Sequence, residues 1–268
     1  MEQTKYAAYF FRRRWPNGFS CPSCGYGAYY TIATRTLPLY ECRLCKHQTT
    51  VTAGTVMEKT RTSLAQWAAA LELLASTNGV NAKQLACAIG VKHKTAWLML
   101  RKLRLAIGEA EDAVKLQGSV HAGLDILAPR RIFVFLPHRR YRCERVVAVS
   151  ASVDSSGMPS QLKLRLVDRD SLVPRQKELA PHGRKAIVEA QAHPAASWSW
   201  LSCNAMHRSP IRGGLLEARA WMNRLFYGVR TKYLQSYLNE FCYRRNAAAR
   251  GTASLEEWEK LCFRRAAS

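Results

Sequence analysis

Hydrophobic positions follow helical spacing in the first part of the chain and form strand-like runs in the second. An aromatic-rich segment runs into Pro16, which predicts a short helix within residues 1–20 that stops before the proline. Over 62–110, apolar residues recur every three or four positions and Gly90 interrupts them, which predicts three helices. Residues 116–268 combine β-branched runs with later amphipathic helices. The pattern predicts an α+β protein with several domains.

The apolar runs of the second part predict both strands and helices. Strands are expected at 120–127, 131–136, 145–153, 161–167 and 185–189. The turn-rich residues 154–159 separate two of these runs, so we expect a hairpin there. Further helices are expected at 216–226, at 233–242 and after a capping signal at Ser254.

The three helices predicted over 62–110 have the order of a helix-turn-helix domain, and the third begins near His93. One side of this third helix is an apolar stripe, made of Ala96, Leu100, Leu103 and Ile107. The other side carries cations, as a helix that docks in a DNA groove requires. The residues expected to contact DNA are His93, Lys94, Thr95, Arg101, Lys102 and Arg104. The alternative is the ordinary basic face of a solvated helix.

Four of the nine cysteines have the spacing of a zinc site. Two Cys-x-x-Cys pairs, Cys21 with Cys24 and Cys42 with Cys45, are separated by 17 residues. Four thiolates complete a tetrahedral shell with no open position, so we expect the zinc to be structural. Two disulfides or a redox Cys-x-x-Cys are the alternatives. A ribbon as small as residues 21–55 has little core, so the metal would supply most of its folding energy.

The charge of the chain adds a class of partner. There are 41 Lys and Arg residues against 19 Asp and Glu, for a net charge of +22, and 48% of the residues are hydrophobic. This surplus favours a polyanionic partner, most simply nucleic acid, although a generally basic protein is the alternative. No apolar run reaches the roughly 18 residues of a membrane span, and the start of the chain has no secretory pattern. We therefore expect a cytoplasmic, nucleoid-associated protein.

Several segments carry a likeness to a known family, at 14–25, 40–45, 49–55, 90–97, 227–229 and 233–241. In these segments and in the order of its parts, nearly the whole chain resembles the insertion-sequence transposases of the ISXO-like type. The implied domains are an N-terminal helix at 1–20, a zinc ribbon at 21–55, a helix-turn-helix domain at 62–110 and an RNase H-like transposase domain at 116–268.

The resemblance also implies a catalytic site, in which carboxylates hold two Mg²⁺ ions for DNA cleavage and strand transfer. Its register places Gly123 where the first aspartate belongs, with Asp125 two residues later on the same strand face. Glu189 and Glu217 stand at the second and third positions. A glycine has no side chain to ligate Mg²⁺, so a degenerate site is expected.

Three functions are consistent with this sequence. The first is a sequence-specific DNA-binding protein, a domesticated or decayed transposase whose strand transfer is lost or impaired. The second is an active transposase that uses Asp125, Glu189 and Glu217 with Mg²⁺, and the third is a zinc-ribbon transcription regulator. In each case the expected partner is double-stranded DNA with a terminal-repeat or operator-like sequence. A homodimer or a higher oligomer on DNA is compatible with the pattern, because no heptad seam fixes the stoichiometry.

Overall fold

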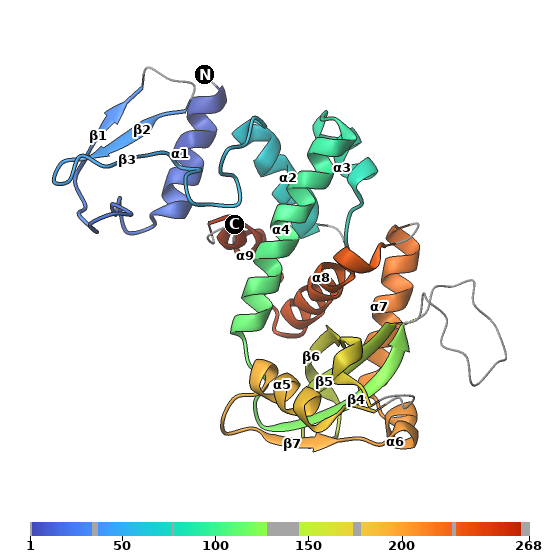
Figure 1. Ribbon diagram of the computed structural model, residues 1–268. Helices are drawn as coiled ribbons and strands as arrows, with labels where there is room; N and C mark the ends of the chain where they lie inside the picture. The colour runs from blue at the N-terminus through green and yellow to red at the C-terminus, as the bar shows by residue number, and fades with distance from the viewer. Residues whose placement is uncertain are drawn as a thin grey trace. The chain divides into compact units, whose positions relative to one another are not determined.

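The computed structural model describes residues 2–33, 37–76, 78–127, 145–173, 178–226 and 229–263 (Figure 1). The strand expected at 131–136 lies outside these residues. The chain divides into two compact units. The N-terminal unit contains the residues up to Ala106 and those from Ala253 onward, and the second unit runs from Ile107 to Thr252. The predicted α+β class, with an N-terminal cysteine cluster and a C-terminal sheet-and-helix domain, is confirmed.

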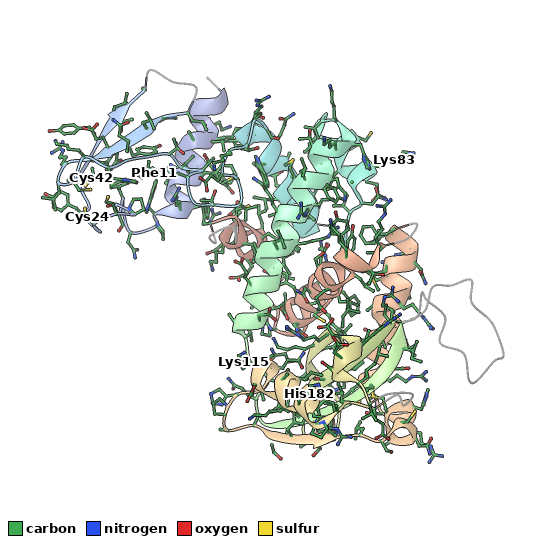
Figure 2. The ribbon with its side chains drawn as sticks, viewed as in Figure 1. Phe11, Cys24, Cys42, Lys83, Lys115 and His182 are labelled. Carbon is green, nitrogen blue, oxygen red and sulfur yellow. The ribbon has the colours of Figure 1, made fainter. Side chains whose placement is uncertain are left out.

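The N-terminal unit begins with a helix that packs on a small antiparallel sheet. Its elements are α1 (Glu2–Arg14), β1 (Tyr29–Ile32), β2 (Leu39–Cys42) and β3 (Gln48–Thr49). Aromatic rings from both parts meet at centroid separations of 4.7–6.3 Å; they belong to Phe11, Trp15, Phe19, Tyr29 and Tyr40. Phe11 is labelled in Figure 2 on the side of α1 toward the strands. This ring cluster is the core that joins helix and ribbon.

Three helices follow at the predicted places: α2 (Leu64–Ser76), α3 (Ala82–Ile89) and α4 (His93–Ala113). The predicted capping box at the start of α2 is present, because Ser63 and Gln66 exchange hydrogen bonds of 3.2 Å. Gly90 ends α3 with φ 66°, a left-handed conformation that favours glycine. The sharp turn that this glycine allows joins α3 to α4 in the helix-turn-helix order.

The C-terminal helix α9 (Leu255–Cys262) belongs to the N-terminal unit, which differs from the predicted boundary of 116–268. The buried carboxylate of Glu259 accepts a hydrogen bond from the Tyr9 hydroxyl and lies 2.9 Å from the Arg13 guanidinium. The Cys262 carbonyl accepts a 3.0 Å hydrogen bond from the backbone N–H of Val56. An amphipathic helix must bury its apolar face, but its own pattern does not specify against which part of the chain.

The second unit is built on one mixed sheet, in the order β6-β5-β4-β7. Its strands are β4 (Ser119–Leu127), β5 (Arg145–Val153), β6 (Pro159–Leu166) and β7 (Ser197–Trp200). The first three pair antiparallel, including the predicted hairpin of β5 and β6, and β7 pairs parallel with β4. In the hairpin turn, the Asp154 carboxylate accepts 2.9 Å hydrogen bonds from the backbone N–H groups of Ser156 and Met158.

Helices cover both faces of this sheet. Along β5, Val147 and Val149 contribute to one buried cluster and Ala148 to another, and alternate residues of a strand point to opposite faces. The first cluster includes residues of α6 (Cys203–Arg208), α7 (Ile211–Leu225) and α8 (Thr231–Ala249). The second includes Ile187 of α5 (Pro181–Gln191), which follows the short helix η1 (Arg169–Ser171). Figure 1 shows these helices around the strands.

The strand predicted at 185–189 is wrong, because these residues lie within α5. Gly183, Ile187 and Gln191 are its buried residues and recur every four positions, which is a helical period. A short apolar run does not distinguish a strand from a helix by itself. The fourth strand is instead β7, whose Ser-Trp-Ser-Trp alternation over Ser197–Trp200 is the period of a half-buried strand.

Side-chain amides of α8 form hydrogen bonds with the β6 edge of the sheet. The Asn246 amide exchanges two 2.9 Å hydrogen bonds with the backbone N–H and carbonyl of Leu162 on β6. Gln235 accepts at 2.7 Å from the N–H of Leu166 and donates at 2.9 Å to the carbonyl of Leu164. These bonds replace the partner strand that an edge strand lacks, so β6 does not offer a free edge at these positions.

Candidate metal centre and nucleic-acid interface

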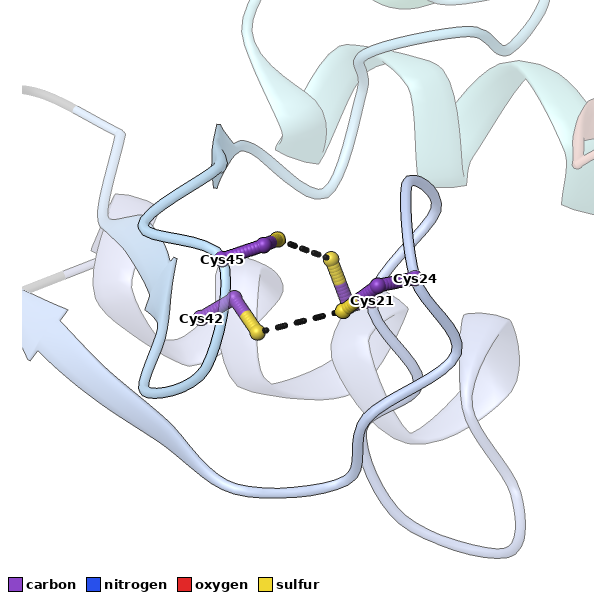
Figure 3. Close-up of side chains that lie close together, drawn as sticks. All are labelled: Cys21, Cys24, Cys42 and Cys45. Carbon is purple, nitrogen blue, oxygen red and sulfur yellow. Dashed lines mark hydrogen bonds between the residues drawn. The ribbon is translucent and has the colours of Figure 1, made fainter.

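Four cysteine sulfurs converge at one end of the ribbon. Two come from the turn before β1, Cys21 and Cys24, and two from the end of β2 and the turn after it, Cys42 and Cys45. All four sulfurs lie within 4.8 Å of one another, with 3.6 Å between Cys21 and Cys45 and between Cys24 and Cys42 (Figure 3). Both Cys-x-x-Cys pairs therefore point at one centre.

The sulfur cluster fits a tetrahedral zinc ion. A Zn–S bond of about 2.3 Å implies sulfur separations of about 3.8 Å. Hydrogen bonds from the Tyr26 backbone lower the pKa of Cys24, but its contacts with the sulfurs of Cys45 and Cys42, together with burial, raise it to about 12. At Cys21, burial raises the pKa, but hydrogen bonds from the Cys24 and Ser23 backbone and contacts with the sulfurs of Cys45 and Cys24 lower it to about 7. The cluster thus favours ionisation at one sulfur and opposes it at another, and a divalent cation at the centre favours ionisation of all four. The cluster supports the predicted structural zinc and leaves no coordination position for a substrate.

The carboxylate expected to serve as the first catalytic ligand is already engaged. Asp125 lies on β4, and one of its oxygens is 2.6 Å from the Arg212 guanidinium of α7. The other oxygen accepts a 2.7 Å hydrogen bond from the backbone N–H of Ile126. The Asp125 side chain is 13% exposed. Arg212 was not anticipated from the sequence, because it lies 87 positions from Asp125.

The other two expected carboxylates lie on exposed helix surfaces. Glu189 is on α5, 66% exposed, with an oxygen 3.9 Å from the Lys185 ammonium. Glu217 is on α7, 60% exposed, with an oxygen 3.4 Å from the Arg245 guanidinium. Over the described part of the chain, the four cysteines are the one group in which three or more His, Cys, Asp or Glu ligand atoms come within 4.8 Å of one another. The three carboxylates are therefore not assembled into a magnesium site.

The place of the expected first aspartate is filled by a neighbouring side chain. A Cβ atom added to Gly123 would lie 2.7 Å from the sulfur of Met206 and 3.1 Å from its Cγ. Met206 comes from α6, is 1% exposed and belongs to the main apolar cluster of this unit. The space beside β4 at this position is thus occupied by packed hydrocarbon and sulfur, neither of which ligates Mg²⁺.

A pocket of about 260 Å³ opens beside Asp125. The acidic and basic side chains on its wall are Asp125, Glu178, Arg184 and His207, and the other lining residues are apolar apart from Ser202 and Cys203. Two carboxylates face two basic groups, so the pocket does not concentrate the negative charge that a two-metal site requires.

The first turn of α4 presents polar side chains to solvent. His93 and Lys94 are exposed, and Thr95 is half-buried. Further along the helix, Arg101 is exposed and its guanidinium lies 5.8 Å from the centre of the Trp97 ring. These positions agree with the predicted division of α4 into an inner and an outer face.

Two cations predicted to contact DNA are not free at the helix surface. The Lys102 ammonium donates a 2.9 Å hydrogen bond to the Glu58 carbonyl and is half-buried. Arg104 is 4% exposed, and this burial does not favour the predicted contact with phosphates. The reason is helical geometry: Arg104 follows Leu100 by four residues and precedes Ile107 by three, which places it beside the buried stripe.

The fold and the cysteine cluster define a zinc-ribbon protein. Residues 2–48 match the family described as the transposase zinc-ribbon domain, and this match includes α1 as well as the ribbon. The N-terminal part is therefore similar to the zinc ribbons of transposases, and the predicted resemblance to insertion-sequence transposases is confirmed in this part.

Two further comparisons concern solved structures and curated proteins. Among solved structures, it is similar to a chain in "Crystal structure of a pre-cleavage Mos1 transpososome", at 12% identity over 74% of this chain and 78% of that one, with a TM-score of 0.22. A likeness this remote does not establish a shared fold or function. No curated protein matches the chain. Within the described residues, no helix is long and apolar enough to cross a bilayer.

Proposed function

We propose that the protein binds double-stranded DNA at a specific sequence and does not cut it. The observation that carries the proposal is the combination, in one compact unit, of a transposase-type zinc ribbon and a helix-turn-helix with an exposed polar face on α4. Terminal repeats, or operators derived from them, are the expected sites. The net charge of +22 supplies the sequence-independent attraction to phosphates.

Each part of the N-terminal unit has a role in this proposal. Cys21, Cys24, Cys42 and Cys45 hold a zinc ion that keeps the ribbon folded, and the ion takes no part in chemistry. At the start of α4, His93, Lys94 and Thr95 approach base edges, because recognition helices lead with their N-terminal residues. Arg101 lies further along the exposed face of α4 and contacts phosphate.

The absence of cleavage in the proposal is supported by the second unit. Magnesium needs several carboxylate oxygens around one position. Here Asp125 is neutralised by Arg212 at 2.6 Å, and Met206 fills the space beside Gly123. Two-metal sites tolerate misplacement of about 1 Å poorly, so exposed carboxylates on separate helices do not replace the lost ligand. The second unit then serves as a scaffold with basic surfaces.

Lys94→Ala is expected to weaken specific DNA binding by about 5- to 30-fold, the loss of roughly 1–2 kcal/mol that one base or phosphate contact contributes. A binding site is first selected from a random duplex library with the full-length protein, and affinities are then measured by mobility shift. Lys260→Ala is the matched control, because this ammonium of the same unit lies 2.8 Å from Glu257 and 3.3 Å from Glu256. Failure of the protein to select any sequence would contradict the proposal.

With the selected duplex and Mg²⁺ or Mn²⁺, we expect neither nicking nor strand transfer, and Asp125→Ala should bind the duplex like the unmodified protein. Cleavage is not expected because Asp125 is engaged by an ion pair and the space beside Gly123 is filled. The products are resolved on denaturing gels. Metal-dependent nicking that disappears in Asp125→Ala would support the alternative of an active transposase.

A further inference from the structure

The two Cys-x-x-Cys turns of the ribbon have the same backbone but different residues at one demanding position. In the first turn, the N–H of Gly25 donates to the carbonyl of Cys21 at 2.8 Å. In the second, the N–H of Lys46 donates to the carbonyl of Cys42 at 3.1 Å. Both residues have left-handed backbone, with φ 76° at Gly25 and φ 58° at Lys46. The second turn therefore has a lysine where the first has glycine.

This lysine is costly for the fold. A left-handed conformation costs an L-residue with a Cβ about 1–2 kcal/mol, whereas glycine adopts it freely. Strained backbone of this kind is retained where the side chain has a use that offsets the cost. Because the turn itself favours glycine, a role of the Lys46 side chain outside the turn would explain its presence.

The Lys46 side chain shares an exposed aromatic ring with a second cation. Its ammonium lies 5.6 Å from the centre of the Tyr30 ring, and the Arg43 guanidinium lies 4.6 Å from the same centre. Tyr30 is 50% exposed. Among the described residues, neither cation forms an ion pair, and the nearby ribbon acid Glu41 accepts a 2.7 Å hydrogen bond from Gln48. Two positive charges that form no ion pair among the described residues are thus held over one ring at the ribbon surface.

We infer that Tyr30, Arg43 and Lys46, here called the ribbon cation site, bind the phosphate backbone of duplex DNA. The inference rests on the proposed function and adds a second contact region to α4. Charge complementarity favours phosphate, and the ring orders both cations in advance, so less side-chain entropy is lost when they meet phosphate oxygens. Contacts of this type fix the position of a protein on the duplex without reading its sequence.

Lys46→Gly provides a test in which stability and binding move in opposite directions. Glycine relieves the backbone strain, so the thermal stability and zinc content of the full-length protein should stay equal or rise. Affinity for the selected duplex should fall about five- to tenfold at 0.1 M salt, and the slope of log K against log[salt] should fall in magnitude by about 0.9 for one lost phosphate contact. Arg43→Ala should have a similar effect on affinity and slope.

Two control variants separate the site from general charge. Lys46→Arg keeps the cation and should keep the affinity within about twofold. Lys5→Ala removes an equal charge from an exposed position on α1, and it should also change the affinity by less than about twofold. If the unmodified protein selects a duplex by α4, yet Lys46→Gly and Arg43→Ala bind it with unchanged affinity and slope, the ribbon cation site is overturned and the proposed function stands. If the unmodified protein selects no duplex, both are overturned.

Discussion

Removal of zinc is expected to unfold the ribbon and abolish specific DNA binding. The ribbon sheet has strands of only two to four residues, and its non-metal core is essentially one aromatic cluster. Structural zinc contributes about 10–16 kcal/mol in small zinc domains, which is comparable with the whole stability of a typical domain. Metal content, circular dichroism and mobility shift are measured on the full-length protein before and after treatment with a strong chelator, and zinc is then restored.

Cys42→Ser provides the same test without a chelator, because it removes a sulfur that is buried at the centre of the cluster. Cys87→Ser is the matched control: this thiol is exposed on α3, outside the cluster. We expect Cys42→Ser to bind zinc weakly and to lose DNA binding, and Cys87→Ser to keep both. Retention of native structure and duplex affinity by metal-free protein would contradict the structural role of zinc.

Gly123→Asp, which restores the aspartate that the family resemblance leads one to expect, should destabilise the second unit by about 4 kcal/mol or more. The Cβ alone overlaps the Met206 sulfur at 2.7 Å, and the carboxylate would enter the main apolar cluster without a partner. Losses of this size come from a short set of causes, which includes buried unpaired charge and overpacking. The free energy of unfolding is measured by denaturant titration, and no DNA cleavage is expected to appear with Mg²⁺.

Gly213→Asp is the matched control for this substitution. A Cβ at Gly213 meets no heavy atom within 4 Å, and its place in the first turn of α7 favours a carboxylate. Gly123→Asp combined with Met206→Ala should recover part of the lost stability, because the smaller side chain leaves room for the new Cβ. An unchanged unfolding free energy for Gly123→Asp alone would show that Met206 does not close this position.

Much of the local structure was predictable because it depends on neighbours in the chain. The helical periods gave α1 to α4, α7 and α8, and the β-branched runs gave β4, β5 and β6 with their hairpin. The paired Cys-x-x-Cys spacing was enough to bring four sulfurs together, since each pair forms one compact turn. Helix α5 was predicted as a strand, because a run of only three apolar residues, 186–188, fits either period.

The candidate sites needed information that local patterns do not hold. Lys102 and Arg104 lie on a basic helix segment, but one is tied to the Glu58 carbonyl and the other is buried. Arg14, part of an arginine run that resembles a free basic patch, donates to the carbonyls of Thr50 and Val51 at 2.7 and 2.8 Å. Charge is visible in a sequence, whereas the partner that already satisfies it is not.

The sequence by itself determined a zinc ribbon, a helix-turn-helix and a mixed α+β domain, because caps, turns and short metal-binding loops are encoded within a few residues. Only the tertiary structure decided that α9 folds back into the N-terminal unit, that Met206 fills the space beside Gly123, and that Arg212 engages Asp125. Each of these contacts joins residues more than 80 positions apart, and such pairings are selected by the packing of whole faces against one another.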